Sequence, residues 1–178
     1  MKCALVMSLL GLLAMPVFAQ DQAMAARTAA GCGADNTQYA VKTDKAQHPQ
    51  GQIPGGKALV YVFEQEKVGP GFKIGAVTVR VGLDGQWIGA NHGNTYFFFA
   101  VAPGDHSICA NWQSSIGRLA KLASAASLTA APGQTYYFQA RVDERSHDNP
   151  AVWMEPVDPA EAKILIASAS LSNFCAKN

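Results

Sequence analysis

The stretch AVTVRVGLDGQWIGA, residues 76–90, decides the fold. Its first half places Val77, Val79 and Val81 at every second position, which is the period of a half-buried strand. Asp84-Gly85 follows directly and is the strongest short-range hairpin signal, because both central residues of a type I′ turn need positive φ. The stretch therefore predicts two antiparallel strands joined by a two-residue turn.

Strand and turn patterns repeat on both sides of this hairpin. Residues 58–63 (ALVYVF) are rich in β-branched and aromatic side chains and predict a strand that is buried on both faces. The hairpin is expected to extend through turns at 91–94 and 102–105 into a four-stranded meander. The further predicted strands are 95–101, 106–112, 127–130, 136–142 and 151–155, the third and fourth of them forming a second hairpin around Pro132-Gly133.

One helix is predicted near the end of the chain. Asp158, Pro159 and Glu161 stand where a helix N-cap, a first-turn proline and an N3 glutamate belong. The helix should continue through Ile164, Leu165 and Ala167, whereas the state of 114–124 is left open. The expected fold is mostly β, an antiparallel β-sandwich with a short C-terminal helix.

Composition limits the class of protein. The chain has 178 residues, is 49% hydrophobic and 15% charged, and carries 14 Lys plus Arg against 13 Asp plus Glu. These values suit one globular domain and exclude a disordered tail or a polybasic nucleic-acid binder. Near-neutral charge also removes the field that would steer the protein to nucleic acid or to anionic lipid headgroups.

The beginning of the chain is typical of a signal peptide. Lys2 is followed by an uncharged apolar stretch that ends at Ala19, and cleavage is expected between Ala19 and Gln20. That stretch is shorter than the roughly 20 residues of a membrane-spanning helix, and no later segment is expected to span a membrane. The predicted parts are a signal peptide (1–19), an extended leader (20–56) and a β-sandwich domain (57–178), in a periplasmic or secreted protein.

The cysteines fit an oxidising compartment. Cys3 is lost with the signal peptide. The cysteines that remain are Cys32, Cys109 and Cys175. We favour a disulfide between Cys32 and Cys109, because it would staple a weakly hydrophobic leading segment onto the domain. A Cys109–Cys175 bond that pins the C-terminal tail is the alternative. Ala29-Ala30-Gly31 before Cys32 also allows a lipidated cysteine, although charged residues separate it from the apolar segment.

One group of polar side chains is the candidate binding surface. If Pro103-Gly104 closes a two-residue turn, Thr95 lies opposite Trp112, and the 91–94 loop lies beside the end of the next strand. Amide donors and acceptors around one indole could then hold the edge of a sugar or a peptide. The alternative is that the asparagines serve the turn and the indole caps the core. The candidate residues are Asn91, His92, Asn94, Asn111, Trp112 and Gln113.

Catalytic and metal motifs are absent from the sequence. His92 and His106 are expected at opposite ends of a strand, roughly 20 Å apart, so they cannot share one metal ion. No Gly-x-Ser-x-Gly, HExxH or phosphate-binding glycine loop is found. We expect no metal and no cofactor. A hydrolase of an envelope polymer, with His92 or His106 as general base, is the enzymatic alternative.

The aromatic strand 95–101 has two apolar faces. Phe97 and Phe99 point to one face, and Tyr96 and Phe98 point to the other. A second layer must therefore cover each face. We expect the rest of the sandwich on one side and the terminal helix or the leader on the other. The alternative is that a protein partner or a second copy of the chain covers Tyr96 and Phe98.

Several of these segments together resemble a known bacterial family. They are GKALVYV (56–62), VGLDGQWIG (81–89), TYF (95–97), VAPGDH (101–106) and PGQTYY (132–137). They resemble the family named domain of unknown function 2846 over about Lys57 to Val142. The chain is also similar to the short surface domains named for Pro-Glu-Gly-Ala repeats, although Ala102-Pro103-Gly104-Asp105 departs from that tetrapeptide.

The resemblance implies an exported bacterial β-sandwich of the cell envelope, without an established activity or catalytic residues. The functional expectation is a non-catalytic module that binds an envelope protein or a glycan. An envelope-polymer hydrolase and a self-assembling structural protein are the two alternatives.

Overall fold

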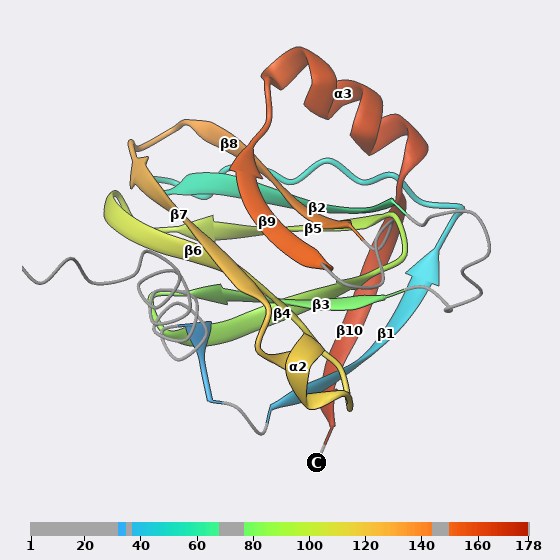
Figure 1. Cartoon of the computed structure of the whole chain (residues 1–178). Helices are drawn as coiled ribbons and strands as arrows, with labels where there is room; N and C mark the ends of the chain where they lie inside the picture. Colours follow the sequence, from blue (N-terminus) through green and yellow to red (C-terminus); the bar gives the residue numbers. More distant parts are fainter. Residues whose placement is uncertain (1–31, 35–36, 68–76, 144–149, 178) are drawn as a thin grey trace, which may run out of the picture.

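The computed structural model describes residues 32–34, 37–67, 77–143 and 150–177, and its strands form two packed sheets (Figure 1). One sheet has six strands in the order β1 (Gln38–Asp44), β10 (Ser170–Lys177), β5 (Thr95–Val101), β2 (Ala58–Lys67), β8 (Thr135–Asp143) and β9 (Ala151–Pro156). The other has four, in the order β4 (Gln86–His92), β3 (Thr78–Leu83), β6 (Gly104–Trp112) and β7 (Ala123–Ala130). The described helices are α2 (Gly117–Ala120) and α3 (Pro159–Ser168). The predicted antiparallel-rich sandwich with a short helix near the C-terminus is confirmed.

The main core lies between the two sheets. Val60 and Val62 of β2 are fully buried, as are Val79 and Val81 of β3 on the opposite sheet. Alternation along each strand brings every second side chain into this layer. The same alternation leaves the intervening residues of both sheets on outer faces, and other parts of the chain cover a portion of each face.

The hairpin of β3 and β4 is confirmed. Leu83 pairs with Gln86, and the two turn residues between them, Asp84 and Gly85, have φ of 51° and 79°. Positive φ at both central positions is what a type I′ turn requires. Local turn chemistry therefore sufficed to predict this pair of strands.

The predicted four-stranded meander is wrong beyond that hairpin. β5 crosses to the six-stranded sheet, where it pairs with β2 and β10, and β6 returns to pair with β3 and β7. Trp112 consequently pairs with Val79 rather than lying opposite Thr95. The second predicted hairpin is also wrong, because β7 and β8 belong to different sheets. A turn reverses the chain without specifying which sheet the next strand joins, and a strand with two apolar faces needs cover on both sides.

The two ends of the described chain form one ribbon. β1 lies within the predicted extended leader and pairs along its whole length with β10, a strand that the sequence did not predict (Figure 1). Tyr39 of β1 is 7% exposed and packs edge-on against Phe174 of β10 at a centroid distance of 5.7 Å. Residues 38–44 of the predicted leader therefore form an edge strand of the six-stranded sheet.

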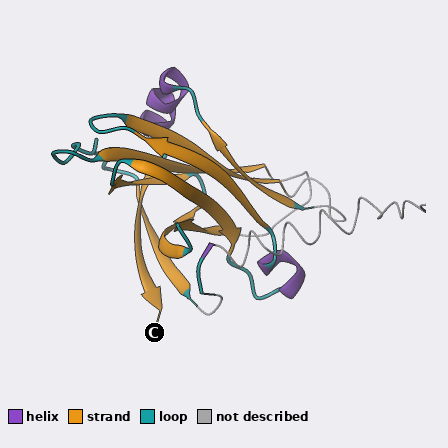
Figure 2. Cartoon of the chain, turned by 90° about the vertical axis from the view of Figure 1, so that its left-hand side faces the viewer, coloured by secondary structure: helices purple, strands orange, loops and turns teal. Residues whose placement is uncertain are grey.

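Helix α3 covers the outer face of the six-stranded sheet (Figure 2). The Asp158 carboxylate accepts a hydrogen bond from the Ala160 N–H, and Pro159 opens the helix, so the predicted N-terminus is confirmed. Leu165 and Ile166 pack in a second apolar cluster with Tyr96, which is fully buried. The expectation that a helix covers the Tyr96 side of the aromatic strand is thus met.

The targeting segment is outside the part of the chain that the structure describes. The predicted signal peptide, residues 1–19, and the leader as far as residue 31 belong to this part. Among the described residues, no helix has the length and apolar character needed to cross a bilayer.

Candidate functional site

The structure divides the predicted binding surface into buried and accessible residues. Asn91, Asn111 and Trp112 are at most 5% exposed, whereas His92, Asn94 and Gln113 are partly or fully exposed. The predicted arrangement depended on a β5–β6 pair that does not form. The predicted surface is therefore corrected: its amides belong largely to internal hydrogen-bond networks, and the Trp112 indole packs in the core.

Asn91 and Gln113 use their amides to join strands. The Asn91 Nδ2 donates to the Val62 carbonyl at 3.0 Å, and its Oδ1 accepts from the Thr95 hydroxyl at 3.2 Å. Gln113 accepts from the Tyr39 N–H at 2.7 Å and donates to the Tyr39 carbonyl at 2.9 Å. Both side chains act as substitutes for backbone pairing, so they are not free to bind a ligand.

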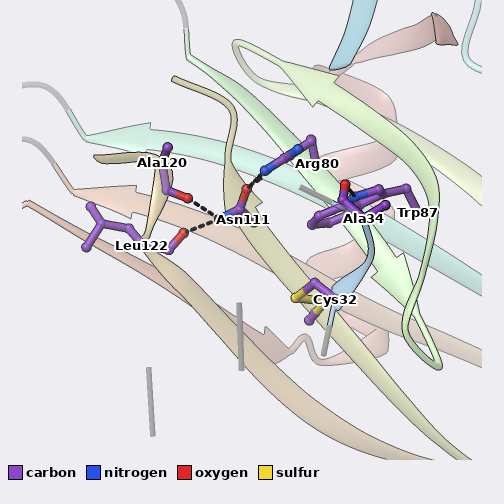
Figure 3. Close-up of a disulfide and its surroundings, with 8 residues drawn as sticks. Cys32, Ala34, Arg80, Trp87, Asn111, Ala120 and Leu122 are labelled. Carbon is purple, nitrogen blue, oxygen red and sulfur yellow. Dashed lines mark hydrogen bonds between the residues drawn. A yellow bond between two sulfur atoms is a disulfide. The ribbon is translucent and has the colours of Figure 1, made fainter. Parts of the chain in front are cut away.

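The amide of Asn111 is likewise occupied by hydrogen bonds, one of them from Arg80 (Figure 3). The Arg80 Nε donates to Asn111 Oδ1 at 3.0 Å, and Asn111 Nδ2 donates to the carbonyls of Ala120 and Leu122 at 2.8 and 3.0 Å. Arg80 itself is 6% exposed. A buried guanidinium needs such partners because desolvation of an unpaired charge is costly.

Beside this network, a short segment is clamped onto the outer face of the four-stranded sheet (Figure 3). A disulfide joins Cys32 to Cys109, the pairing that the sequence favoured. A Cβ added at Gly82 would lie 2.2 Å from the Cys32 carbonyl oxygen, so only glycine permits this approach. We call the described residues of this segment, Cys32, Gly33, Ala34 and Thr37, the N-terminal clamp.

Aromatic and cationic groups complete the clamp. The Trp87 Nε1 donates to the Ala34 carbonyl at 2.6 Å, and the Arg80 guanidinium lies 4.3 Å from the centre of the Trp87 ring. Arg80 also donates to the Thr37 carbonyl at 2.6 Å. A network that the sequence did not predict therefore binds the backbone of the clamp.

The disulfide also decides between the cysteine alternatives. Because the Cys32 sulfur is bonded to Cys109, it is not available for a lipid thioether, and the Cys109–Cys175 pairing does not form. Cys175 is a free, exposed cysteine on β10. The disulfide agrees with an oxidising environment for the folded protein.

The most unusual titratable group is Glu64 on β2, which the sequence reasoning missed. It is 1% exposed, one carboxyl oxygen accepts from the Asn94 N–H at 2.7 Å, and the other has no hydrogen-bond partner among the described residues. Burial, and secondarily the charge of Glu66, raise the pKa of Glu64 well above its ordinary value. The signal was present in the sequence, because Glu64 and Glu66 continue the inward alternation of Val60 and Val62.

A cavity of about 250 Å³ opens where β2, the 92–95 turn and the end of α3 meet. It combines apolar walls with neutral hydrogen-bonding side chains and the buried Glu64, and buried titratable groups near a cavity mark candidate functional sites. Asn94 is the predicted site residue that lines it. The lining residues are Phe63, Glu64, Gln65, Asn94, Leu165, Ser168 and Ala169.

An aromatic face adjoins the cavity on the same sheet. The Tyr61 ring stacks on Phe63 at 6.3 Å and packs against Tyr96, Phe98 and Tyr137 at 6.3, 5.2 and 5.4 Å. The β1–β2 connection, residues 45–57, runs along this face in Figure 1. Its contacts include hydrogen bonds to the Tyr61 and Tyr96 hydroxyls. The chain itself thus covers part of the face that we considered for an external partner or a second copy.

The structure places the two histidines of the enzymatic alternative in hydrogen bonds. His106 Nδ1 lies 2.7 Å from an Asp84 carboxylate oxygen, and its Nε2 lies 2.9 Å from the Ala102 carbonyl. Both partners are acceptors, so the two hydrogen bonds form together only when both ring nitrogens carry protons, and the Asp84 hydrogen bond raises the pKa of His106. The Nδ1 of His92 pairs with the Thr78 hydroxyl at 2.9 Å.

Metal ligation has no support within the described ranges. No group of three His, Cys, Asp or Glu side chains there is placed to hold a metal ion. His48 contacts neither of the other two described histidines. Its Nδ1 lies 3.0 Å from the Ile166 carbonyl.

Comparisons with known proteins give no relative: no family model, no curated protein and no solved structure matches the chain.

Proposed function

We propose that this protein is an exported, non-catalytic binding module of the bacterial cell envelope, periplasmic or secreted, which binds an envelope protein or a glycan. The cavity beside Glu64 carries the proposal, because it is a concave site that combines apolar walls with a buried carboxyl group and neutral polar side chains. The proposed compartment rests on the predicted signal peptide, and the disulfide supports it.

The size and lining of the cavity suggest the bound group. An apolar cavity of about 150 Å³ holds a benzene molecule, so about 250 Å³ accommodates one ring-sized group. Gln65, Asn94 and Ser168 supply neutral polar groups, and Phe63 and Leu165 supply apolar walls. This combination suits one sugar unit of a glycan or one polar side chain of a protein.

Catalysis by His106 is disfavoured on chemical grounds. A general base needs a free lone pair, and a neutral His106 would have to give up one of its two hydrogen bonds to provide it. His92, whose Nδ1 pairs with the Thr78 hydroxyl, therefore remains the candidate base of the hydrolase alternative.

Site-specific photo-crosslinking in the native bacterium tests the proposal. A photoreactive residue at Gln65 lines the cavity, whereas one at Ile164, 69% exposed on α3, serves as the control position. We expect one reproducible envelope protein or glycan to be captured at Gln65 and not at Ile164. Equal capture at both positions, or none at Gln65, would contradict a binding site in the cavity.

A matched pair of helix variants sharpens this test. Ser168→Trp fills the cavity from α3, whereas Ala167→Trp adds the same side chain at the neighbouring exposed position, which does not line the cavity. Capture at Gln65 should disappear in the first variant and persist in the second. Loss of capture in both would indicate a general effect on the helix.

A further inference from the structure

The β1–β2 connection is held on the aromatic face in the way a receptor holds an extended peptide. The Tyr96 hydroxyl donates to the Pro49 carbonyl at 3.1 Å, and the Tyr61 hydroxyl accepts from the Gly51 N–H at 2.6 Å. The two tyrosines thus bind the backbone at positions two residues apart. Such contacts depend on an extended backbone more than on the side chains of the bound segment.

Glycine is required at one position of this segment. A Cβ added at Gly51 would lie 2.6 Å from the Phe98 ring and 2.9 Å from a Leu59 methyl group. The backbone therefore lies directly on the ring, and a larger residue cannot take this place without displacement. The face selects a small residue two positions after the carbonyl that Tyr96 binds.

The connection contributes little packing of its own. The residues on both sides of Gly51, including Gln50, Gln52 and Ile53, are exposed, and none of the segment belongs to the buried clusters. The rings beneath it are different, because Tyr61 is 3% and Tyr96 0% exposed. By contrast, α3 buries Leu165 and Ile166 on the same face. The rings are also packed by α3, whereas the connection is held by the two tyrosine hydroxyls and by His48, whose Nδ1 lies 3.0 Å from the Ile166 carbonyl.

From these contacts we infer that the aromatic face is a peptide-binding groove, and that residues 49–51 are a displaceable occupant from the chain itself. The partner is an extended segment of another protein that places a glycine over Phe98. The tethered occupant competes at an effective concentration in the millimolar range, so a free peptide gains access only when the connection is lifted. This groove adjoins the proposed cavity, which Phe63, Leu165 and Ala169 of the same apolar cluster line.

Two glycine variants of the same segment provide the test. Gly51→Val should lift the connection, because its side chain meets Phe98 and Leu59. Gly55→Val is the matched control, since a Cβ at Gly55 meets nothing within 4 Å. Both are made in the full chain as the cell processes it. The probe is a labelled peptide of residues 47–54, Gln-His-Pro-Gln-Gly-Gln-Ile-Pro, and fluorescence anisotropy measures its binding.

We expect Gly51→Val to bind this peptide at least about tenfold more tightly than the wild type or Gly55→Val. The same peptide with valine in place of its glycine should not bind. In the Gly51→Val background, Tyr61→Phe or Tyr96→Phe should weaken binding by about two- to tenfold, because each removes one backbone hydrogen bond. This second effect would not arise if the connection were only a structural cover.

A folded Gly51→Val variant that binds no peptide would overturn the inference. If this variant does not fold, the wild type is titrated with millimolar peptide, and ring NMR signals of Tyr61, Tyr96 and Phe98 are followed. Shifts confined to these rings support the groove, and unchanged signals overturn it. Exchange of the connection between two wild-type copies, seen as a dimer without peptide binding, would overturn the assignment to a foreign partner.

Discussion

Two segments of the chain lie across outer faces of the sandwich, and they are held in opposite ways. The N-terminal clamp is fixed to the four-stranded sheet by a disulfide, by the close approach at Gly82 and by the Arg80–Trp87 pair. The β1–β2 connection is held on the six-stranded sheet by tyrosine hydroxyls and a few further contacts. The same architectural task, covering a sheet, is thus solved once by a permanent bond and once by contacts that are individually weak.

The difference matters for what each face can do. A covalently bonded cover with a buried guanidinium beneath it opens only at a large free-energy cost. A cover held by neutral hydrogen bonds, each of which contributes about 0.5–1.5 kcal/mol, can open locally while the fold persists. We therefore expect the clamp to stabilise the fold, and we expect the connection to exchange its contacts.

Removing the disulfide should give the largest effect. The bond joins residues 77 positions apart, and replacement of Cys32 and Cys109 by alanine should lower the free energy of unfolding by about 2–4 kcal/mol. Chemical denaturation of the purified protein measures this loss. Cys175→Ala, which removes only the free exposed thiol, is the control and should change little. Equal stability of the double variant and the wild type would contradict a stabilising clamp.

Alanine at two glycines compares the covers directly. Gly82→Ala places a methyl group against the Cys32 backbone carbonyl, which cannot move freely because Cys32 is bonded to Cys109. We expect a loss of about 1–3 kcal/mol from this overpacking. Gly51→Ala meets side-chain atoms only, and the connection can shift away, so its cost should stay below about 1 kcal/mol. Denaturant titrations that gave the reverse order would break the comparison.

The buried carboxyl of the six-stranded sheet predicts a pH dependence. The pKa of Glu64 is raised in the folded state. Its contribution to the free energy of unfolding is therefore fully present below the ordinary pKa of 4.5 and is lost as the pH rises through the folded-state pKa. Glu64→Gln mimics the protonated form and should be more stable than the wild type at pH 8 by about 1–3 kcal/mol. The advantage should vanish at acidic pH, as urea denaturation at several pH values would show.

The exposed Glu161 of α3 provides the control for that measurement. Glu161→Gln changes a charge in the first turn of the helix, where the expected effect is about 0.3–1 kcal/mol in the destabilising direction. A stabilisation of both glutamine variants at pH 8 would point to net charge rather than to the burial of Glu64.

Local chemistry explains which elements the sequence could predict. The Asp84-Gly85 turn and the Asp158-Pro159 start of α3 depend on φ values and capping groups of neighbouring residues, and both predictions are confirmed. The exchange of β5 and β6 between sheets depends on which distant strands bury their apolar faces. No turn residue encodes that choice, so the meander prediction failed.

The burial of two candidate-site residues went unpredicted for the same physical reason. Asn91 and Asn111 are polar and stand near turns, which favours exposure, but their amides bind the Val62 carbonyl and the Arg80 guanidinium, which lie far away in the sequence. Glu64 shows the converse case, a charged residue type that the sheet pairing buries. The Cys32–Cys109 bond could be predicted without any strand register, because the sequence leaves few cysteines to pair after Cys3 is removed.

The smallest predicted effect is at the exposed end of the four-stranded sheet, where His106 meets Asp84. The pKa of His106 is raised in the folded state. Its contribution to the free energy of unfolding is therefore present below the usual pKa of 6.5 and is lost as the pH rises through the folded-state pKa. The hydrogen bonds from His106 and from the Ser107 N–H lower the pKa of Asp84, so that contribution is present above 3.8 and is lost as the pH falls through the lowered value. The pair should therefore stabilise most between these limits.

Asp84→Asn isolates this ion pair, because asparagine also tolerates the positive φ of the turn. We expect a loss of about 0.2–1 kcal/mol near pH 5–6, and an NMR titration should show the pKa of His106 moving back toward 6.5. Above the folded-state pKa of His106, the difference in stability should shrink to the part that comes from the Ser107 N–H. A difference of the same size at every pH would mean that the carboxylate acts through the turn rather than through the imidazolium.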